Sequence, residues 1–92
     1  MNDTTFEAFA QEAGAQGFDQ VIVREWPAGK VIESHTHPFH AKAFVVQGEM
    51  WLTVGEREQH LRAGDRFEVD KDVPHVERYG PEGATYWVAR RA

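Results

Sequence analysis

The sequence predicts an all-β domain, a sandwich or barrel of short strands that follows one short helix. Ninety-two residues are enough for one domain. From Phe18 onward, short β-branched and aromatic runs are separated by turn-forming residues at intervals of about 8–12 residues, which is typical of an antiparallel β-fold. The part of the chain before Phe18 has helical spacing instead. We therefore expect a single domain over residues 1–92, with a helical segment over residues 1–17 and a β-barrel over residues 18–92.

The first element is predicted to be a short helix over residues 4–13. Thr4 and Glu7 have the spacing of a capping box, the alanines that follow favour helix, and Gly14 is a typical stop. Phe6 and Phe9 lie three residues apart and therefore share one face of this helix. We expect this face to cover one side or end of the core.

Eight short strands are predicted after the helix. They cover residues 21–26, 31–34, 43–47, 50–54, 59–61, 66–69, 76–79 and 85–90. Turn signals rich in glycine, proline and aspartate separate them, at residues 27–29, 48–49, 55–56, 63–65, 71–74 and 80–83. A series of short strands at this spacing predicts an all-β sandwich or barrel.

The composition excludes several classes of function. The chain has no cysteine, so disulfides and thiolate metal sites are excluded, and any metal must be bound by imidazole or oxygen ligands. A net charge of −5 argues against a nucleic-acid binder. No apolar run approaches the roughly 20 residues of a membrane span, and the acidic N-terminus lacks the apolar core of a signal peptide. We expect a cytoplasmic protein with no nucleic-acid or membrane partner.

His35 and His37 are the first candidate functional residues, because residues two apart on a strand point to the same face. Their Cα atoms are expected to lie roughly 6.6 Å apart, which lets two imidazoles bind one ion. His75, arriving from a distant strand, would complete a three-histidine metal site. An ordinary polar surface, or a barrel with no metal, is the alternative.

The same alternation predicts the two faces of the following strand. Three small or apolar residues share the inward face with the histidines: Ala41, Ala43 and Val45. Bulky apolar residues then point outward: Phe44, Val46 and, on the next strand, Trp51. An outward face of this kind needs a cover, either a helix or a second subunit. We expect a homodimer, which would also stabilise so small a domain.

Two motifs resemble those of the cupin superfamily. Gly29, five intervening residues, His35, His37 and then Gly48 are in register with the first cupin motif, and Gly64 and His75 have the spacing of the second. The resemblance covers roughly residues 20–90 and is specific in the combination of both motifs. It implies a cupin double-stranded β-helix, a jelly-roll barrel whose interior binds a divalent metal and a small-molecule ligand.

The sequence also departs from the cupin pattern. At the position of the usual metal-binding glutamate stands Ala41 or, in the alternative register, Lys42. Asp70 and Asp72 replace the proline and glycine of the second motif, and Tyr79 replaces its asparagine. The resemblance therefore implies three metal ligands, the histidines at positions 35, 37 and 75.

Three further residues are candidates for the site. Glu77 shares the parity of His75 and could be a fourth ligand, a partner that orients an imidazole, or the general base; a surface glutamate is the alternative. Tyr79 shares this parity and could contact a bound ligand or belong to the core. His40 follows Pro38, which can shift the strand phase, so it could bind a ligand or lie in a loop.

The predicted site favours a small metal-binding cupin, and two functions remain open. Three imidazoles leave coordination positions for a substrate, and iron, zinc, nickel, copper or manganese suits these ligands. All-histidine cupin sites are similar to those of ferrous dioxygenases that act on thiols, diketones or aromatic acids. The first function is that of a metal-dependent oxygenase or isomerase of a small polar metabolite. The alternative is a non-catalytic module that binds or senses a small ligand.

Overall fold

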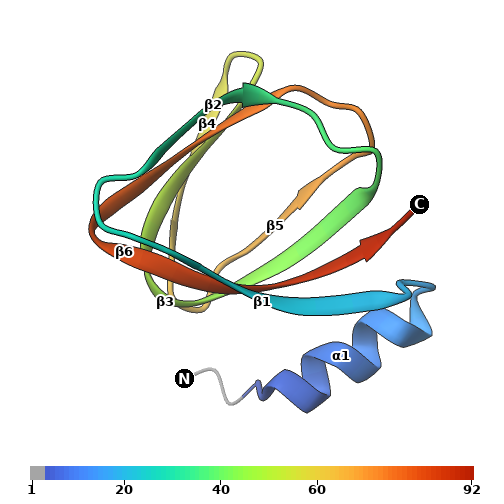
Figure 1. Ribbon diagram of the computed structural model, residues 1–92. Coiled ribbons are helices and arrows are strands. Elements are labelled where there is room, and N and C mark those ends of the chain that lie inside the picture. The colour runs from blue at the N-terminus through green and yellow to red at the C-terminus, as the bar shows by residue number, and fades with distance from the viewer. Residues whose placement is uncertain (1–3) are drawn as a thin grey trace.

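The computed structural model describes residues 4–92 of the chain. Within these residues, helix α1 (Phe6–Ala15) is followed by six strands: β1 (Gln20–Trp26), β2 (Val31–His35), β3 (His40–Val54), β4 (Arg57–Arg62), β5 (Arg66–Val69) and β6 (His75–Arg91). The strands curve around a barrel, and α1 lies outside it beside β1 (Figure 1). The predicted all-β fold preceded by one short helix is confirmed.

Two long antiparallel strands, β3 and β6, run through both halves of the barrel. In one half, the N-terminal part of β3 pairs with the C-terminal part of β6, with β5 beside β3 and β1 beside β6. In the other half, the C-terminal part of β3 pairs with the N-terminal part of β6, with β4 beside β3 and β2 beside β6. This arrangement of two sheets that share bent strands is that of a jelly roll.

The predicted number of strands is wrong, although every predicted segment lies within an observed strand. The predicted turns at residues 48–49 and 80–83 lie inside β3 and β6, so that four predicted segments form two strands. Pairing continues across these points with a shift of register, from Gly48 opposite Ala84 to Met50 opposite Tyr79. Bulges and turns both favour glycine, which is why the sequence pattern does not separate them.

Gly48 and Gly83 form a crowded corner of the barrel. A Cβ atom on Gly48 would lie 2.1 Å from the carbonyl oxygen of Gly83. A Cβ atom on Gly83 would lie 2.2 Å from the carbonyl oxygen of Trp26, at the end of β1. Both glycines have a positive φ, of 78° and 72°. The corner therefore requires residues without a side chain.

Replacing Gly48 with alanine is expected to destabilise the domain by about 2–4 kcal/mol, because the new methyl group overlaps backbone atoms in a left-handed conformation. Gly55→Ala is the matched control, since Gly55 also has a positive φ but nothing within 4 Å of its Cβ position. The control should cost about 1 kcal/mol. Urea unfolding followed by circular dichroism measures both values, and equal losses would contradict the predicted overlap.

The N-terminal helix starts and ends about two residues later than predicted. The side chain of Thr5, rather than Thr4, accepts the capping hydrogen bond from the Ala8 N–H at 3.1 Å. The helix also continues through Gly14 to Ala15. This start places Phe9 and Ala13, four residues apart, on the buried face, and one glycine inside a helix costs only about 1 kcal/mol.

Helix α1 is the cover that the outward face of β3 was predicted to need. Phe9 packs with Phe44 and Trp87 at ring-centroid distances of 6.4 and 6.0 Å, and Phe6 meets the edge of Trp87 at 5.6 Å. Phe44 is thereby buried within a single chain. The homodimer stays a prediction that no longer depends on Phe44. Among residues 4–92, no helix is both long and apolar enough to span a membrane.

The barrel interior contains the residues that strand parity predicted. Ala41, Ala43 and Val45 are buried in the main core cluster, on the opposite face of β3 from Phe44. Met50 and Leu52, on the second half of β3, belong to the same cluster. One end of this interior is a cavity, and the three predicted histidines line it.

Candidate metal centre

His35, His37 and His75 meet at one point of the barrel interior. His35 ends β2 and is paired with His75 at the start of β6, while His37 lies in the short connection to β3. Their ring centroids are 4.2, 4.8 and 4.9 Å apart. One nitrogen from each ring lies within 4.8 Å of the other two. Residues about forty positions apart thus converge as the sequence predicts.

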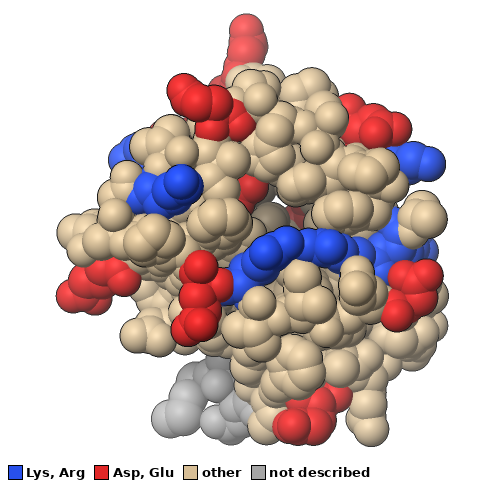
Figure 2. All heavy atoms as spheres, in the orientation of Figure 1, with Lys and Arg blue, Asp and Glu red and all other residues tan. Residues whose placement is uncertain are grey.

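The histidines lie in a cavity of about 240 Å³ that opens to the surface. Figure 2 shows a hollow in the face of the molecule presented in Figure 1, with lysine and arginine side chains along one side of it. The cavity walls are mainly aromatic and aliphatic: Trp26, Ile32, Phe39, Ala41, Phe67, Val69, Tyr86 and Val88. The histidines and charged residues of the lining are Arg24, His35, His37, His75, Glu77 and Arg90. This volume of about 240 Å³ lies below the roughly 300–1,000 Å³ of sites for drug-sized molecules, so the cavity suits a smaller ligand.

Two of the three imidazoles are oriented by backbone carbonyls. The Nδ1 atom of His35 lies 2.8 Å from the Glu33 carbonyl oxygen, and that of His75 lies 3.0 Å from the Val73 carbonyl oxygen. A carbonyl only accepts, so each Nδ1 carries the proton and donates it. In their neutral form both imidazoles then have a lone pair on Nε2, as metal-ligating histidines require.

The Glu77 carboxylate faces both of these Nε2 atoms. Its Oε2 atom lies 3.3 Å from Nε2 of His35 and 3.4 Å from Nε2 of His75. Two ligands of one metal with bonds of about 2.1 Å are separated by roughly 3.0–3.4 Å at octahedral to tetrahedral angles. The spacing therefore fits a donor set of imidazole nitrogens and one carboxylate oxygen, which suits first-row transition metals.

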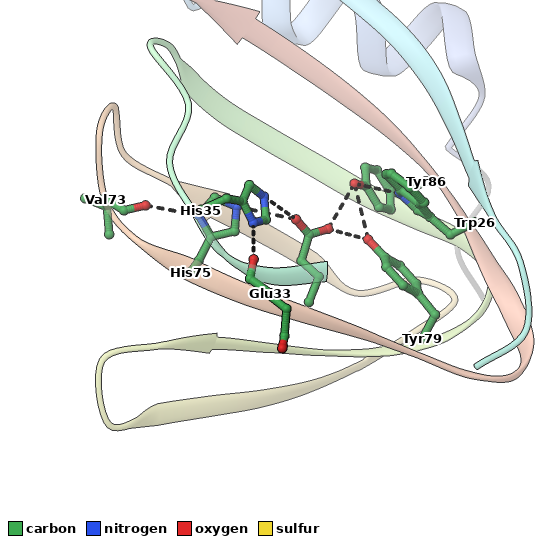
Figure 3. A network of polar contacts seen from close by, with 8 residues as sticks. Trp26, Glu33, His35, Val73, His75, Tyr79 and Tyr86 are labelled. Atoms are coloured by element: carbon green, nitrogen blue, oxygen red, sulfur yellow. Dashed lines mark hydrogen bonds and ion pairs between the residues drawn. The ribbon is translucent and has the colours of Figure 1, made fainter. Parts of the chain in front are cut away.

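A hydrogen-bond network holds the other oxygen of Glu77 (Figure 3). The hydroxyls of Tyr79 and Tyr86 both donate to Oε1, the latter at 3.3 Å. The indole of Trp26 donates to the Tyr86 hydroxyl at 3.2 Å. Glu77 is buried, and these donors fix its carboxyl plane so that Oε2 remains directed at the histidines.

This network favours the ionised carboxylate. Burial alone would raise the pKa of Glu77, but hydrogen bonds from His75 and Tyr79 outweigh it, and the pKa is lowered. The hydrogen bond that a proton on Nε2 of His75 gives to Glu77 raises the pKa of His75, and a metal ion would take the place of this proton. Burial, with the nearby Glu77 charge, raises the pKa of Tyr79. The same two causes raise the pKa of Tyr86 to about 12, so both phenols stay protonated donors.

His37 is held differently from the other two histidines. Its ring stacks on Phe39 at 4.7 Å with an interplanar angle of 4°. Its Nδ1 atom is buried and, among the described residues, has no hydrogen-bond partner. Burial lowers the pKa of His37, so this imidazole favours the neutral form that can bind a metal.

The remaining sequence candidates lie around this centre in different ways. Glu77 lies in it. Tyr79 is buried behind Glu77, outside the cavity lining. His40 is also outside the lining, where it pairs with Asp70 at 3.0 Å and Glu68 at 3.3 Å and packs against Phe18.

Sequence reasoning missed Trp26, Tyr86 and two arginines of the lining, Arg24 and Arg90. Their strands carry a usable signal. Every second residue of β1 points inward, namely Ile22, Arg24 and Trp26. The same alternation on β6 places Tyr86, Val88 and Arg90 on the inward face. An arginine at an inward position of a predicted strand is unusual and points to a site.

Comparison with known proteins identifies sequence relatives of this chain. A family model described as "Cupin domain" matches residues 22–85. An uncharacterized HTH-type transcriptional regulator of Haemophilus influenzae is 39% identical over 64 residues, which are 70% of this chain and 18% of the regulator. This chain therefore spans less than a fifth of that relative.

Solved structures with the same fold are also similar in sequence. The DMSP lyase DddQ of Ruegeria pomeroyi superposes with a TM-score of 0.72 at 26% identity, over 78% of this chain and 37% of the lyase. A conserved protein of Klebsiella pneumoniae with a double-stranded β-helix domain gives a TM-score of 0.65 at 27% identity, over 76% of this chain and 64% of that protein.

Proposed function

The chain belongs to the cupin domain family, and from that premise we propose that it binds a divalent transition metal through His35, His37 and His75. The observation that carries this proposal is the fixed orientation of two imidazoles. The Glu33 and Val73 carbonyls hold the Nδ1 protons, which leaves the Nε2 lone pairs of His35 and His75 directed at the shared centre.

Glu77 is proposed as the fourth protein ligand. Its Oε2 distances to both Nε2 atoms, 3.3 and 3.4 Å, support this role. The residue also supplies the negative charge that is missing where cupins usually place a glutamate, because Ala41 or Lys42 stands there. A carboxylate with a lowered pKa is ready to bind a cation at neutral pH.

The proposed activity is that of an oxygenase or isomerase acting on a small polar metabolite. A bound divalent metal would act as a Lewis acid for an oxygen of the substrate, and iron would add redox chemistry. The aromatic and aliphatic cavity walls would contact the ligand and limit its exposure to water. Tyr79 and Tyr86 hold the Glu77 carboxylate in one orientation during this chemistry.

Metal reconstitution tests the proposal directly. Metal-free protein is incubated separately with zinc, nickel, copper, manganese and, without oxygen, ferrous iron, and is then desalted. Elemental analysis should find a single metal ion per chain for at least one of these metals. Oxygen consumption by the ferrous protein with a panel of small acids and thiols tests for an oxygenase. Failure of every metal to bind would contradict the proposal.

A second function, a ligand-sensing module, is favoured by the 39% identity to a transcriptional regulator. In that case the same cavity would bind a metabolite without changing it. Analysis of the ligand by mass spectrometry, and by NMR for an isomer of the same mass, after incubation with metal-loaded protein and air separates the two functions. A chemically altered ligand supports the enzyme, and recovery of the unchanged ligand supports the sensor.

A further inference from the structure

Two arginines extend into the cavity from neighbouring strands. Arg24 lies on β1 opposite Tyr86, and Arg90 lies on β6 opposite Gln20, four positions along the strand from Tyr86. Even spacing places both on the inward face, and both line the cavity that contains the histidines. Figure 2 shows lysine and arginine side chains beside the hollow.

Neither guanidinium is neutralised by the protein. Among residues 4–92, Arg24 and Arg90 form no ion pair with a carboxylate. The one carboxylate that lines the cavity, Glu77, is already engaged by two histidines and two tyrosines. Two positive charges therefore line the cavity without a carboxylate paired to either of them.

Arg90 is held in place although it is unpaired. Its guanidinium lies 4.6 Å from the centroid of the Phe39 ring, which in turn stacks on His37. Its Nε atom is buried and has no hydrogen-bond partner in the described part of the chain. Burial and the charge of Arg24 both lower the pKa of Arg90, and an anion bound between the two arginines would offset both effects.

The two arginines of the cavity contrast with the acidic balance of the whole chain. Acidic residues outnumber basic ones, and the net charge is −5. A general preference for cations on the surface therefore does not explain two unpaired arginines in this cavity. A local positive charge at the opening of an acidic protein attracts anions specifically to that opening.

We propose that Arg24 and Arg90 bind the oxyanion group, a carboxylate or a phosphate ester, of a small organic ligand whose other end lies at the histidine centre. The placement of the ligand's other end at the histidine centre rests on the proposed function. Guanidinium groups bind both oxyanions through paired hydrogen bonds. The apolar walls formed by Ile32, Phe39 and Phe67 would contact the organic body, and the volume of about 240 Å³ limits its size.

Isothermal titration calorimetry with three matched probes tests this inference. Benzoate, phenyl phosphate and neutral benzamide share one aromatic body and differ in charge. We expect zinc-loaded protein to bind one or both anions and to bind benzamide at least about tenfold more weakly, because a charge-assisted hydrogen bond is lost. The preferred anion distinguishes a carboxylate ligand from a phosphate ester.

Arginine variants assign the binding to these residues. Arg24→Gln and Arg90→Gln should each weaken anion binding about 10–100-fold. Arg57→Gln is the control, since Arg57 lies on β4 outside the cavity lining and its replacement changes the net charge equally. Arg90→Lys keeps the charge but loses the paired geometry, and it should also weaken binding.

The outcomes separate this inference from the proposed function. Equal binding of benzamide and the anions, or equal losses in Arg57→Gln and the cavity variants, would overturn the arginine site. Zinc content measured on each variant should remain that of the wild type, which supports a role in anion binding alone. The protein could bind none of the metals tested and still bind benzoate, with weaker binding in Arg24→Gln and Arg90→Gln. In that case the arginine site stands and the proposed metal function falls.

Discussion

Replacing His75 with alanine is expected to abolish metal binding while the barrel remains folded. His75 is buried, and its Nε2 atom faces the point shared with His35 and His37. Even partners outside the ligand set change metal affinity by about 10–100-fold, so the loss of a ligand should exceed about 100-fold. Competition with a chromogenic zinc chelator measures this loss, and circular dichroism checks the fold.

His60→Ala provides the matched control. His60 lies on β4, stacks on Trp51 at 4.5 Å and pairs with Glu49 at 2.7 Å, outside the cavity lining. This variant should retain the metal affinity of the wild type. Should His75→Ala unfold, His35→Ala replaces it, because the His35 side chain is 26% exposed and less integral to the core. A folded variant at position 75 or 35 that keeps wild-type affinity would rule out the three-histidine centre.

The sequence predicts the strands and the convergence of the histidines better than it predicts the path of the chain. Alternation within a strand is a local property, and it correctly placed Ala43 inside the barrel and Phe44 under a cover. The continuity of β3 through Gly48 depends on the backbone of Gly83, thirty-five positions away, against which Gly48 packs. Contacts of this kind are absent from any local pattern.

In the candidate site, too, local alternation could be predicted from the sequence and contacts between distant strands could not. Strand parity placed Glu77 on the face of His75, and the structure brings its Oε2 atom to 3.4 Å from that imidazole. The arginines at positions 24 and 90 became visible only through the pairing of β1 with β6, which places both on one wall of the cavity. His40 illustrates the opposite case, because its phase after Pro38 could not be read from the sequence, and it pairs with acidic residues outside the cavity.

Glu77→Gln is expected to lower metal affinity by at least about 100-fold without unfolding the protein. The glutamine carbonyl can still accept the hydrogen bonds that Tyr79 and Tyr86 give to Oε1. Its amide nitrogen would then replace Oε2, about 3.3–3.4 Å from the Nε2 atoms of His35 and His75. An amide N–H donates to the lone pairs that the metal needs, so the substitution removes a charge and also blocks two imidazole ligands.

Tyr79→Phe separates the charge of Glu77 from its orientation. This variant removes one hydrogen bond to Oε1 and leaves the carboxylate in place, so metal affinity should fall by only about tenfold. Cobalt substitution adds a second measurement, because the visible d–d absorption of cobalt reports its ligands. Glu77→Gln should change this spectrum, whereas Tyr79→Phe should preserve its shape. An unchanged cobalt spectrum together with wild-type zinc affinity in Glu77→Gln would remove the carboxylate from the metal centre and leave three imidazoles as its protein ligands.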